Sequence, residues 1–171
     1  MKFRDIPGHE RVRQRLRAMV DNDQVPHALL ISGIAGIGKM SLARAMAQYL
    51  ACTDRRDGDS CGVCAACRQH ESFNFPDLHF SFPIVKRTSP KRDLSSDYSA
   101  EWQQMLREEP YMPFTAWMQL LDAGNTQPRM YVTQSEEMLR LASLAPYGAE
   151  KKVFIIWLPE RWGPEVANKL L

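Results

Sequence analysis

The sequence predicts an α/β fold in which a parallel β-sheet is covered by helices on both faces. Two short apolar runs, residues 26–32 and 153–157, have the composition of strands buried at the centre of such a sheet. A glycine-rich loop and then a segment with helical spacing follow the first run, which gives the order strand, loop, helix. At 171 residues, of which 44% are hydrophobic and 25% charged, the chain is long enough for one cored domain.

The first third of the chain predicts an opening helix within residues 9–25, the strand at 26–32 and a phosphate-binding loop. Residues 33–39 have the spacing G-x-x-x-x-G-K, in which backbone N–H groups and a lysine ammonium hold phosphate oxygens. The alternative is a glycine turn before an ordinary helix. The candidate phosphate-binding residues are Gly33, Gly36, Gly38, Lys39, Met40 and Ser41.

Met40 occupies the position at which this type of loop supplies a hydroxyl group to Mg²⁺. A thioether is not the hard oxygen ligand that Mg²⁺ needs, and Ser41 comes one residue too late on the helix. We therefore expect no Mg²⁺ site, and the sequence leaves open whether ATP or ADP binds.

Four cysteines, all that the chain contains, follow the loop and its helix. Cys52, Cys61, Cys64 and Cys67 have the pattern C-x8-C-x2-C-x2-C. Without an export signal, four thiolates at this spacing indicate tetrahedral zinc before disulfides, and a complete ligand set indicates a structural site. Cys52 is the weakest member because it stands apart, and His70 is an alternative ligand; incidental buried thiols are the other interpretation.

The second apolar run ends without the acidic residues that nucleotide hydrolysis needs. In P-loop ATPases an aspartate at the end of this strand binds Mg²⁺, and a glutamate often activates water. Trp157 and Leu158 occupy these places, and Glu160 reaches the site only if the chain turns sharply at Pro159. Together with Met40, they predict a chain with no catalytic residues and no intrinsic ATPase activity.

The stretch from residue 81 to about residue 127 is predicted to be an additional, helical insertion. Two groups of apolar residues recur in it at helical spacing, and we expect them to pack on each other or on the domain. A partner-binding groove is the alternative. The two groups are Tyr98, Trp102, Met105 and Leu106, and Phe114, Trp117, Met118 and Leu121.

One dense basic run lies in this insertion. Lys86, Arg87, Lys91 and Arg92 could neutralise DNA phosphates or contact a partner, whereas the alternative is a solvated loop. The whole chain has 22 basic and 20 acidic residues, a formal net charge of +2, so its overall charge gives no argument for nucleic acid binding.

The remaining segments complete the predicted alternation of helices and strands. His79 is expected in a strand rather than at a metal, and residues 133–136 have capping-box spacing at the start of a helix. The sequence has no apolar run long enough to span a membrane and no signal-peptide core at its start, so we expect a cytoplasmic protein.

These segments, in this order, resemble the AAA+ proteins of the bacterial DNA polymerase III clamp loader. Besides the opening helix, strand, phosphate loop and cysteine module, the resemblance includes residues 76–79, 144–147, 151–156 and 164–171. The inserted cysteine module is its most specific part, because phosphate loops are shared by many unrelated activities. The resemblance implies a P-loop NTPase/AAA+ domain over residues 1–171, truncated before the family's arginine finger, with its zinc module at 52–67.

The same resemblance implies a role in DNA replication. The departures at Met40, Trp157 and Leu158 favour the delta prime type, a non-hydrolysing structural subunit of the ring that loads the sliding clamp on primed DNA. The implied partners are the gamma/tau and delta subunits and, through the complex, the clamp and primer-template DNA in the bacterial cytoplasm. Two rival hypotheses are an ATP-hydrolysing gamma/tau-type subunit that uses Ser41 and Glu160, and a zinc-bearing nucleic-acid binding module.

Overall fold

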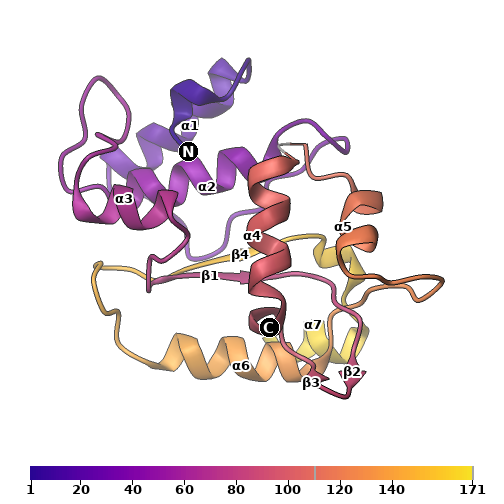
Figure 1. Cartoon of the computed structure of the whole chain (residues 1–171). Coiled ribbons are helices and arrows are strands. Elements are labelled where there is room, and N and C mark those ends of the chain that lie inside the picture. Colours follow the sequence, from indigo (N-terminus) through magenta and orange to yellow (C-terminus); the bar gives the residue numbers. More distant parts are fainter. Residues whose placement is uncertain (110, 171) are drawn as a thin grey trace. The chain divides into compact units, whose positions relative to one another are not determined.

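The computed structural model describes residues 1–109 and 111–170, with the side chains of 169 and 170 excepted, and the chain forms two compact units. Unit 1 comprises Met1–Leu78 and Tyr147–Val153, and unit 2 comprises the rest of the described chain. Leu171, the last residue of the resemblance, lies outside the described residues. The helices and strands are α1 Glu10–Asp21, α2 Lys39–Ala51, α3 Ala65–Glu71, β1 Leu78–Ser81, β2 Arg87–Thr88, β3 Lys91–Arg92, α4 Ser99–Glu108, α5 Phe114–Leu120, α6 Val132–Ser143, β4 Val153–Ile156 and α7 Pro164–Leu170 (Figure 1).

Unit 1 is built on the packing of α1 against α2. Each helix carries an apolar stripe at helical spacing, and the stripes face each other because this removes both from water. The short 3₁₀ turn Phe3–Asp5 adds Phe3, which is fully buried against the Tyr49 ring at a centroid distance of 5.7 Å. The buried cluster consists of Phe3, Ile6, Leu16, Val20, Leu42, Ala45, Met46 and Tyr49.

The predicted strand at residues 26–32 is wrong for this structure. The segment has no regular secondary structure, and Leu30 is 79% exposed. Its apolar composition suits a central strand, but a central strand is stabilised by hydrogen bonds to neighbours on its edges. No described residue pairs with this segment, so composition alone does not make it a strand.

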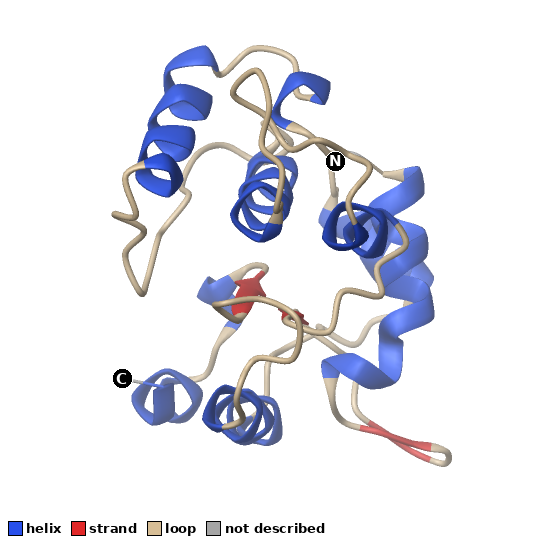
Figure 2. Cartoon of the chain, turned by 90° about the vertical axis from the view of Figure 1, so that its left-hand side faces the viewer, coloured by secondary structure: helices blue, strands red, loops and turns tan. Residues whose placement is uncertain are grey.

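The sheet of β1 and β4 is parallel, as predicted, but among the described residues it has two strands where we expected a larger sheet. The Val153 N–H donates to the Asp77 carbonyl and the Trp157 N–H donates to the Ser81 carbonyl, both at 2.8 Å. From the first bond to the second, both strands advance four residues in the same direction, as in a parallel pair. Figure 2 shows how little of the described chain is strand, including the antiparallel hairpin of β2 and β3.

In unit 2 the sheet carries helices on both faces. Phe80 on β1 contacts Trp102 of α4 at 5.7 Å between ring centroids, whereas the neighbouring His79 approaches Glu137 of α6. Successive strand residues point to opposite faces, which explains this division. His79 therefore lies in a strand, as predicted, and its ring lies 5.0 Å from that of Phe154 on β4.

The helices expected in the 81–127 stretch are present as α4 and α5, and the next helix begins slightly earlier than predicted. The residue 133–136 capping box is not used, because α6 begins at Val132. The Gln134 side chain accepts a hydrogen bond from the Tyr131 N–H at 2.9 Å, and the Thr133 hydroxyl instead donates to the Asp93 carbonyl at 3.1 Å. Sequence spacing located the helix, but the hydrogen bond between the Tyr131 N–H and the Gln134 side chain sets its first residue.

Asp77 fixes the loop that leads into β4. Its carboxylate is 1% exposed and accepts the backbone N–H groups of Tyr147, Gly148 and Ala149 at 2.8, 2.7 and 3.0 Å. Burial raises the pKa of this carboxyl, but the three amide hydrogen bonds lower it by more than burial raises it. The net pKa is therefore below its ordinary value. This local contact joins residues far apart in sequence at the start of the parallel pair.

Candidate metal centre and phosphate-binding loop

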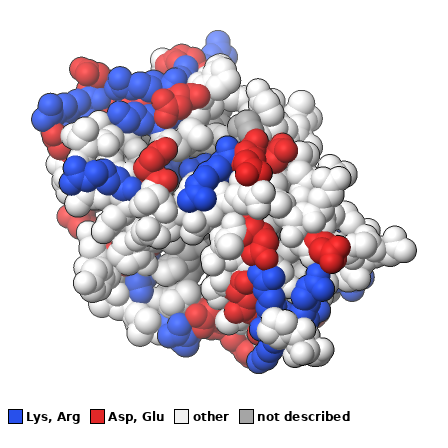
Figure 3. All heavy atoms as spheres, viewed as in Figure 1, with Lys and Arg blue, Asp and Glu red and all other residues white. Residues whose placement is uncertain are grey.

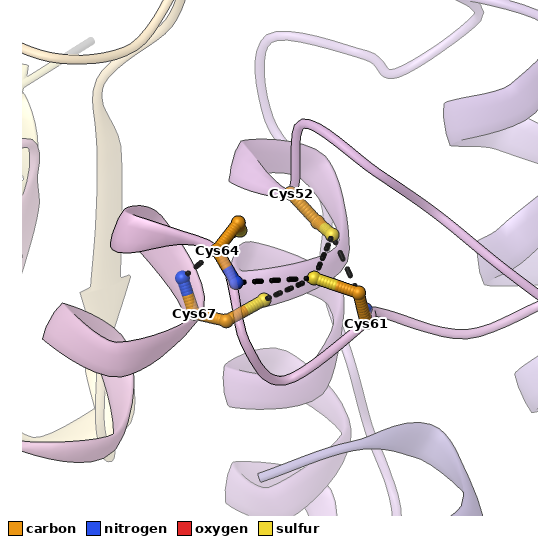
Figure 4. Close-up of side chains that lie close together, drawn as sticks. All are labelled: Cys52, Cys61, Cys64 and Cys67. Carbon is orange, nitrogen blue, oxygen red and sulfur yellow. Dashed lines mark hydrogen bonds between the residues drawn. The ribbon is translucent and has the colours of Figure 1, made fainter.

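The four cysteines come together in unit 1 at the end of α2. Cys52 caps α2, Cys61 and Cys64 flank a tight turn, and Cys67 lies in α3, so that their sulfurs point toward one another (Figure 4). All four Sγ atoms lie within 4.8 Å of one another, with Cys52 to Cys61 at 3.6 Å and Cys61 to Cys67 at 3.9 Å. Tetrahedral zinc with Zn–S bonds of about 2.3 Å requires sulfur separations of about 3.8 Å. The ligand set therefore fits a tetrahedral soft metal ion.

Backbone amides surround these sulfurs. Gly62 adopts φ +80, which lets the turn direct the Val63 and Cys64 N–H groups to the Cys61 sulfur at 3.4 and 3.3 Å. Both amides lower the pKa of Cys61. Burial raises the pKa of Cys64, but the Cys67 N–H and further hydrogen bonds bring it to about 6. Such amides stabilise the thiolate form, which is the form that binds metal.

His70 is not a fifth candidate in this geometry. It is 6% exposed on α3, its ring stacks on Phe75 at a centroid distance of 4.3 Å, and it is not among the four residues whose ligand atoms converge. Burial lowers the pKa of His70 to about 4, with nearby positive charge adding to the effect, so its imidazole is neutral at pH 7. In this geometry Cys52, and not His70, has its ligand atom beside those of the other three cysteines.

Residues 33–39 form a loop that begins α2 with Lys39 as its first residue. Gly36 and Gly38 adopt φ +76 and +90, values that an L side chain rarely takes. The Lys39 ammonium donates to the carbonyls of Gly33 and Ile34 at 2.8 and 2.7 Å. A phosphate group at this loop would compete with these two carbonyls for the ammonium.

The side chain next to this lysine is not available to a ligand. Met40 is 7% exposed and lies in the core of unit 1, whereas Ser41 is half-buried one position further along α2. A thioether in the core supplies neither a charge nor an oxygen to the loop. The loop therefore presents backbone and ammonium donors without a hydroxyl at the position after the lysine.

The end of β4 lies in an aromatic cluster of unit 2. The Trp157 ring lies 5.4 Å from that of Trp102 on α4, and 6.3 Å from those of Trp117 and Phe114 on α5. Sequence reasoning placed the α4 and α5 stripes correctly but missed that they receive Trp157. The helical period shows which residues share a face, but not which distant residue they meet.

Glu160, the other candidate near this strand, is exposed. It lines a hollow of about 360 Å³ together with Arg129, Arg161 and Trp162. Between it and β4, Leu158 has φ +59 and the chain turns through the 3₁₀ segment Pro159–Arg161. The chain thus turns at Pro159, which is the condition that the sequence set for Glu160 to reach the site.

The basic run forms the β2–β3 hairpin, and each of its four cations has a partner within unit 2. On the face drawn in Figure 3, Lys and Arg lie interspersed with Asp and Glu. The partners are the Tyr131 ring for Lys86 (4.3 Å), the Leu121 carbonyl for Arg87 (2.7 Å), Asp93 for Lys91 (3.2 Å) and Glu101 for Arg92 (2.7 Å).

Comparison with known families identifies the group to which this fold belongs. A family model described as DNA polymerase III, delta subunit, matches residues 8–171. The chain belongs to the DNA polymerase III delta-subunit family. Within this family assignment, the mixed helices, the small parallel sheet and the four-cysteine cluster fit the α/β AAA+ clamp-loader fold.

This member of the delta-subunit family is also similar to curated bacterial proteins over part of its length. It is 40% identical over 76 residues to DNA polymerase III subunit tau of Salmonella typhimurium, which covers 44% of this chain and 12% of that protein. It is 37% identical over 76 residues to subunit tau/gamma of Haemophilus influenzae, covering 44% and 11%, and 38% identical over 65 residues to subunit gamma/tau of Mycobacterium tuberculosis strain H37Rv, covering 38% and 11%. The aligned part thus spans about an eighth of the length of these relatives. Among the described residues, no helix is both long and apolar enough to cross a bilayer.

Proposed function

We propose that this chain acts in DNA replication as a delta prime-type subunit of the DNA polymerase III clamp loader. In this role it is a non-hydrolysing structural member of the complex that places the sliding clamp on primed DNA. The family match supports membership in the polymerase III assembly. The proposal of the delta prime type depends on the residues at the phosphate loop and at the end of β4.

The observation that carries the proposal is the aromatic cluster around Trp157. In a hydrolysing P-loop ATPase the end of this strand presents a carboxylate to Mg²⁺, and a metal site must be hydrated and polar. Here the Trp157 ring packs against Trp102 and Trp117, and Leu158 follows in place of a second acid. These aromatic and aliphatic side chains supply no oxygen ligand to Mg²⁺. We therefore expect no metal-assisted charge neutralisation at the end of β4.

The loop at residues 33–39 remains compatible with binding of a nucleotide. The loop at residues 33–39 has a lysine ammonium at its end and glycines at two positions of positive φ. These groups can hold phosphate oxygens without metal. We propose weak, Mg²⁺-independent binding of ATP or ADP at Gly33, Gly36, Gly38 and Lys39, with no catalytic residue and no turnover.

Cys52, Cys61, Cys64 and Cys67 are proposed to hold a structural zinc ion. When bound, zinc would link the end of α2, the tight turn and α3 through four thiolates and leave no position for a substrate. Removing zinc from the native chain with a chelator should increase proteolysis within residues 52–71 while the rest of unit 1 stays folded. Unchanged cleavage would contradict a structural zinc.

The proposed partners are the gamma/tau and delta subunits and, through the complex, the sliding clamp and primer-template DNA. The β2–β3 hairpin is a proposed contact with DNA or a partner. Among its cations, Lys91 has the more exposed side chain of the two ion-paired residues, at 76%, whereas that of Arg92 is 24% exposed. Arg87 and Arg92 are engaged by carbonyl and carboxylate groups and contribute chiefly to the hairpin itself.

An ATP-hydrolysing gamma/tau-type subunit is the second candidate, because the curated relatives with 37–40% identity are tau or tau/gamma subunits. This hypothesis requires Ser41 and Glu160 to supply the oxygens that Met40 and Trp157 do not. It predicts Mg²⁺-dependent turnover, which the delta prime hypothesis does not.

The deciding experiment is calorimetric titration of the chain with ATP, with and without Mg²⁺, followed by an assay of phosphate release. We expect no binding or weak binding that Mg²⁺ does not strengthen, and no release above the background. Tight Mg²⁺-dependent binding with turnover would support the gamma/tau type instead. A parallel reconstitution with gamma/tau, delta and clamp tests whether the chain supports clamp loading as the non-hydrolysing subunit.

A further inference from the structure

Asp59, in the loop between Cys52 and Cys61, is a buried carboxylate that is neither one of the four candidate metal ligands nor part of the phosphate-binding loop. It is 2% exposed and accepts the backbone N–H groups of Phe3 at 3.1 Å, Arg4 at 2.9 Å and Ser60 at 2.8 Å. The Arg4 Nε also donates to it at 3.3 Å. Charge-assisted bonds of this kind are among the stronger hydrogen bonds in proteins. The carboxylate therefore holds the segment at residues 3–4 against the cysteine loop.

Two further contacts strengthen this junction from both sides. Ser60 Oγ accepts from Gln48 Nε2 of α2 at 2.9 Å, and Gln48 is 2% exposed. The Lys2 ammonium donates to the Cys61 carbonyl at 3.1 Å, directly beside a predicted zinc ligand. The cysteine loop is thus fixed to α2 and to residues 2–4 at the same place, so movement of its sulfurs would move both.

The same N-terminal segment continues to the phosphate loop through α1. The Phe3 carbonyl accepts from the Arg13 guanidinium at 3.0 Å, which sets the start of α1 against residues 3–5. His9 then caps α1, and its Nε2 lies 2.7 Å from the Ile37 carbonyl. A carbonyl can only accept, so Nε2 carries the proton in this contact.

These contacts close a circuit in unit 1. One arm is α2, which begins at Lys39 of the phosphate loop and ends at Cys52. The other arm runs from the cysteine loop through Asp59, residues 3–4 and α1 to His9 and Ile37. We propose that Asp59 is a positioning residue through which metal at the four cysteines sets the conformation of the phosphate-binding loop. The inference rests on the proposed zinc site and gives that site a role beyond local stability.

The element with two states is the segment at residues 2–9, either docked on Asp59 or released from it. Coupling between two sites requires such an element, biased by both. With zinc bound, the cysteine loop holds Asp59 in register with the Phe3 and Arg4 amides, and His9 holds the Ile37 carbonyl. Without zinc the loop relaxes, the segment is released and the His9 contact is lost.

The simpler reading, that Asp59 is only a fold-stabilising carboxylate, makes a different prediction. In that case its loss lowers stability, but the His9 imidazole in the folded protein keeps its bond to Ile37. The test therefore needs a readout on His9 itself in protein that is still folded and still metal-loaded. The tautomer of the imidazole is such a readout, because the Ile37 contact selects the form protonated at Nε2.

The experiment measures histidine ring ¹⁵N chemical shifts by NMR in the full chain, with zinc content measured on the same samples. His9→Gln assigns the His9 signal. Three samples are compared with the zinc-loaded wild type: chelator-treated wild type, Asp59→Asn, and Asp57→Asn as a matched control. Asp57 is an exposed aspartate of the same loop at φ +52, a conformation that asparagine also adopts.

In the wild type and in Asp57→Asn we expect one zinc ion per chain and a His9 signal of the Nε2-protonated form. In Asp59→Asn we expect zinc to be retained, the His9 ring to shift toward a mixture of tautomers, and inorganic phosphate to bind about fivefold or more weakly. Chelation should cause the same His9 shift in a folded protein.

An unmoved His9 signal in zinc-loaded Asp59→Asn, or in folded chelated protein, would overturn the inference while leaving the zinc site intact. A wild type that binds no zinc would overturn the proposed metal site and, with it, the coupling. The two failures are therefore told apart by the zinc content.

Discussion

The loop at residues 33–39 and the end of β4 are the two regions on which the proposed non-hydrolysing role depends, and they depart from the P-loop ATPase pattern in different ways. The loop at residues 33–39 keeps glycines at positive φ and a lysine, and it departs from the usual pattern at one side chain, Met40. The end of β4 departs in kind, because Trp157 takes part in a packed aromatic cluster. Phosphate affinity and hydrolysis are thus separable, since the first depends on backbone and charge and the second on a polar metal site.

The largest expected effect comes from breaking the aromatic cluster. Trp102→Ala removes a ring that is 2% exposed, stacks on Phe82 at 4.1 Å and contacts Trp157. We expect a loss of about 3–5 kcal/mol in the free energy of unfolding. All four tryptophans of the chain lie in unit 2, so denaturant unfolding followed by tryptophan fluorescence reports on this unit.

Tyr111→Ala is the matched control, because this aromatic side chain is 63% exposed and its loss should change stability by about 0.5 kcal/mol or less. The comparison between the two regions also requires that phosphate binding at residues 33–39 survives Trp102→Ala in protein that is still folded. If Trp102→Ala lowered the free energy of unfolding by less than about 1 kcal/mol, the aromatic cluster would be loosely packed and Trp157 would be free to be replaced.

The second effect concerns the loop. Lys39→Met keeps the length of the side chain but removes the ammonium that contacts the Gly33 and Ile34 carbonyls. A hydrogen bond to a charged group contributes about 1.5–3 kcal/mol, so phosphate or pyrophosphate should bind about 10- to 100-fold more weakly. Calorimetric titration at low salt measures this, with Lys151→Met as the control, since Lys151 pairs with Asp23 on the surface. Equal affinities would mean that the loop has lost phosphate binding as well.

Features that are set by residues close together in the sequence could be predicted from it. The cysteine loop was predictable because all its ligands lie between Cys52 and Cys67, and a metal with fixed geometry converts spacing into structure. The helical stripes of α4 and α5 were predictable because helical period is local. The zinc assignment itself and the phosphate role are proposals that the same local signals support.

Features that depend on distant partners were missed. The segment at residues 26–32 has the composition of a buried strand, yet strand formation needs neighbours, and no described residue supplies one. Asp59 was not identified from the sequence, because its role appears only when the Phe3 and Arg4 amides reach it. Asp77 likewise shows its role only through residues 147–149. A buried carboxylate leaves no periodic signal, so only its structural context identifies it.

A third, somewhat smaller effect tests what holds the strand pair in place. Asp77→Asn weakens the bonds to the Tyr147, Gly148 and Ala149 amides, and we expect a loss of about 1–3 kcal/mol at pH 7. Because the folded pKa of Asp77 lies below its unfolded value, the stabilisation is fully present above about pH 4. It is lost as the pH falls further through the folded pKa.

Urea unfolding followed by circular dichroism at pH 7, 5 and 3 measures this dependence. The gap between wild type and Asp77→Asn should be similar at pH 7 and 5 and narrower at pH 3. Asp122→Asn is the control, since Asp122 is exposed and at φ +47, and it should lie within about 0.5 kcal/mol of wild type at pH 7. A gap that widens toward low pH would contradict the assigned sign.

The smallest expected effect is an attempt to reverse the divergence. The double variant Met40→Thr with Trp157→Asp introduces the residue types that P-loop ATPases have at these two positions, yet we expect phosphate release to stay at background. The new carboxylate would face the Trp102 and Trp117 rings, where burial raises its pKa and leaves it without a polar partner. Trp157→Asn combined with Met40→Thr is the control without the charge, and fluorescence of the remaining tryptophans checks that unit 2 stays folded. Mg²⁺-dependent turnover in the double variant alone would mean that two side chains, and not the aromatic surroundings that α4 and α5 provide, separate this chain from an ATPase.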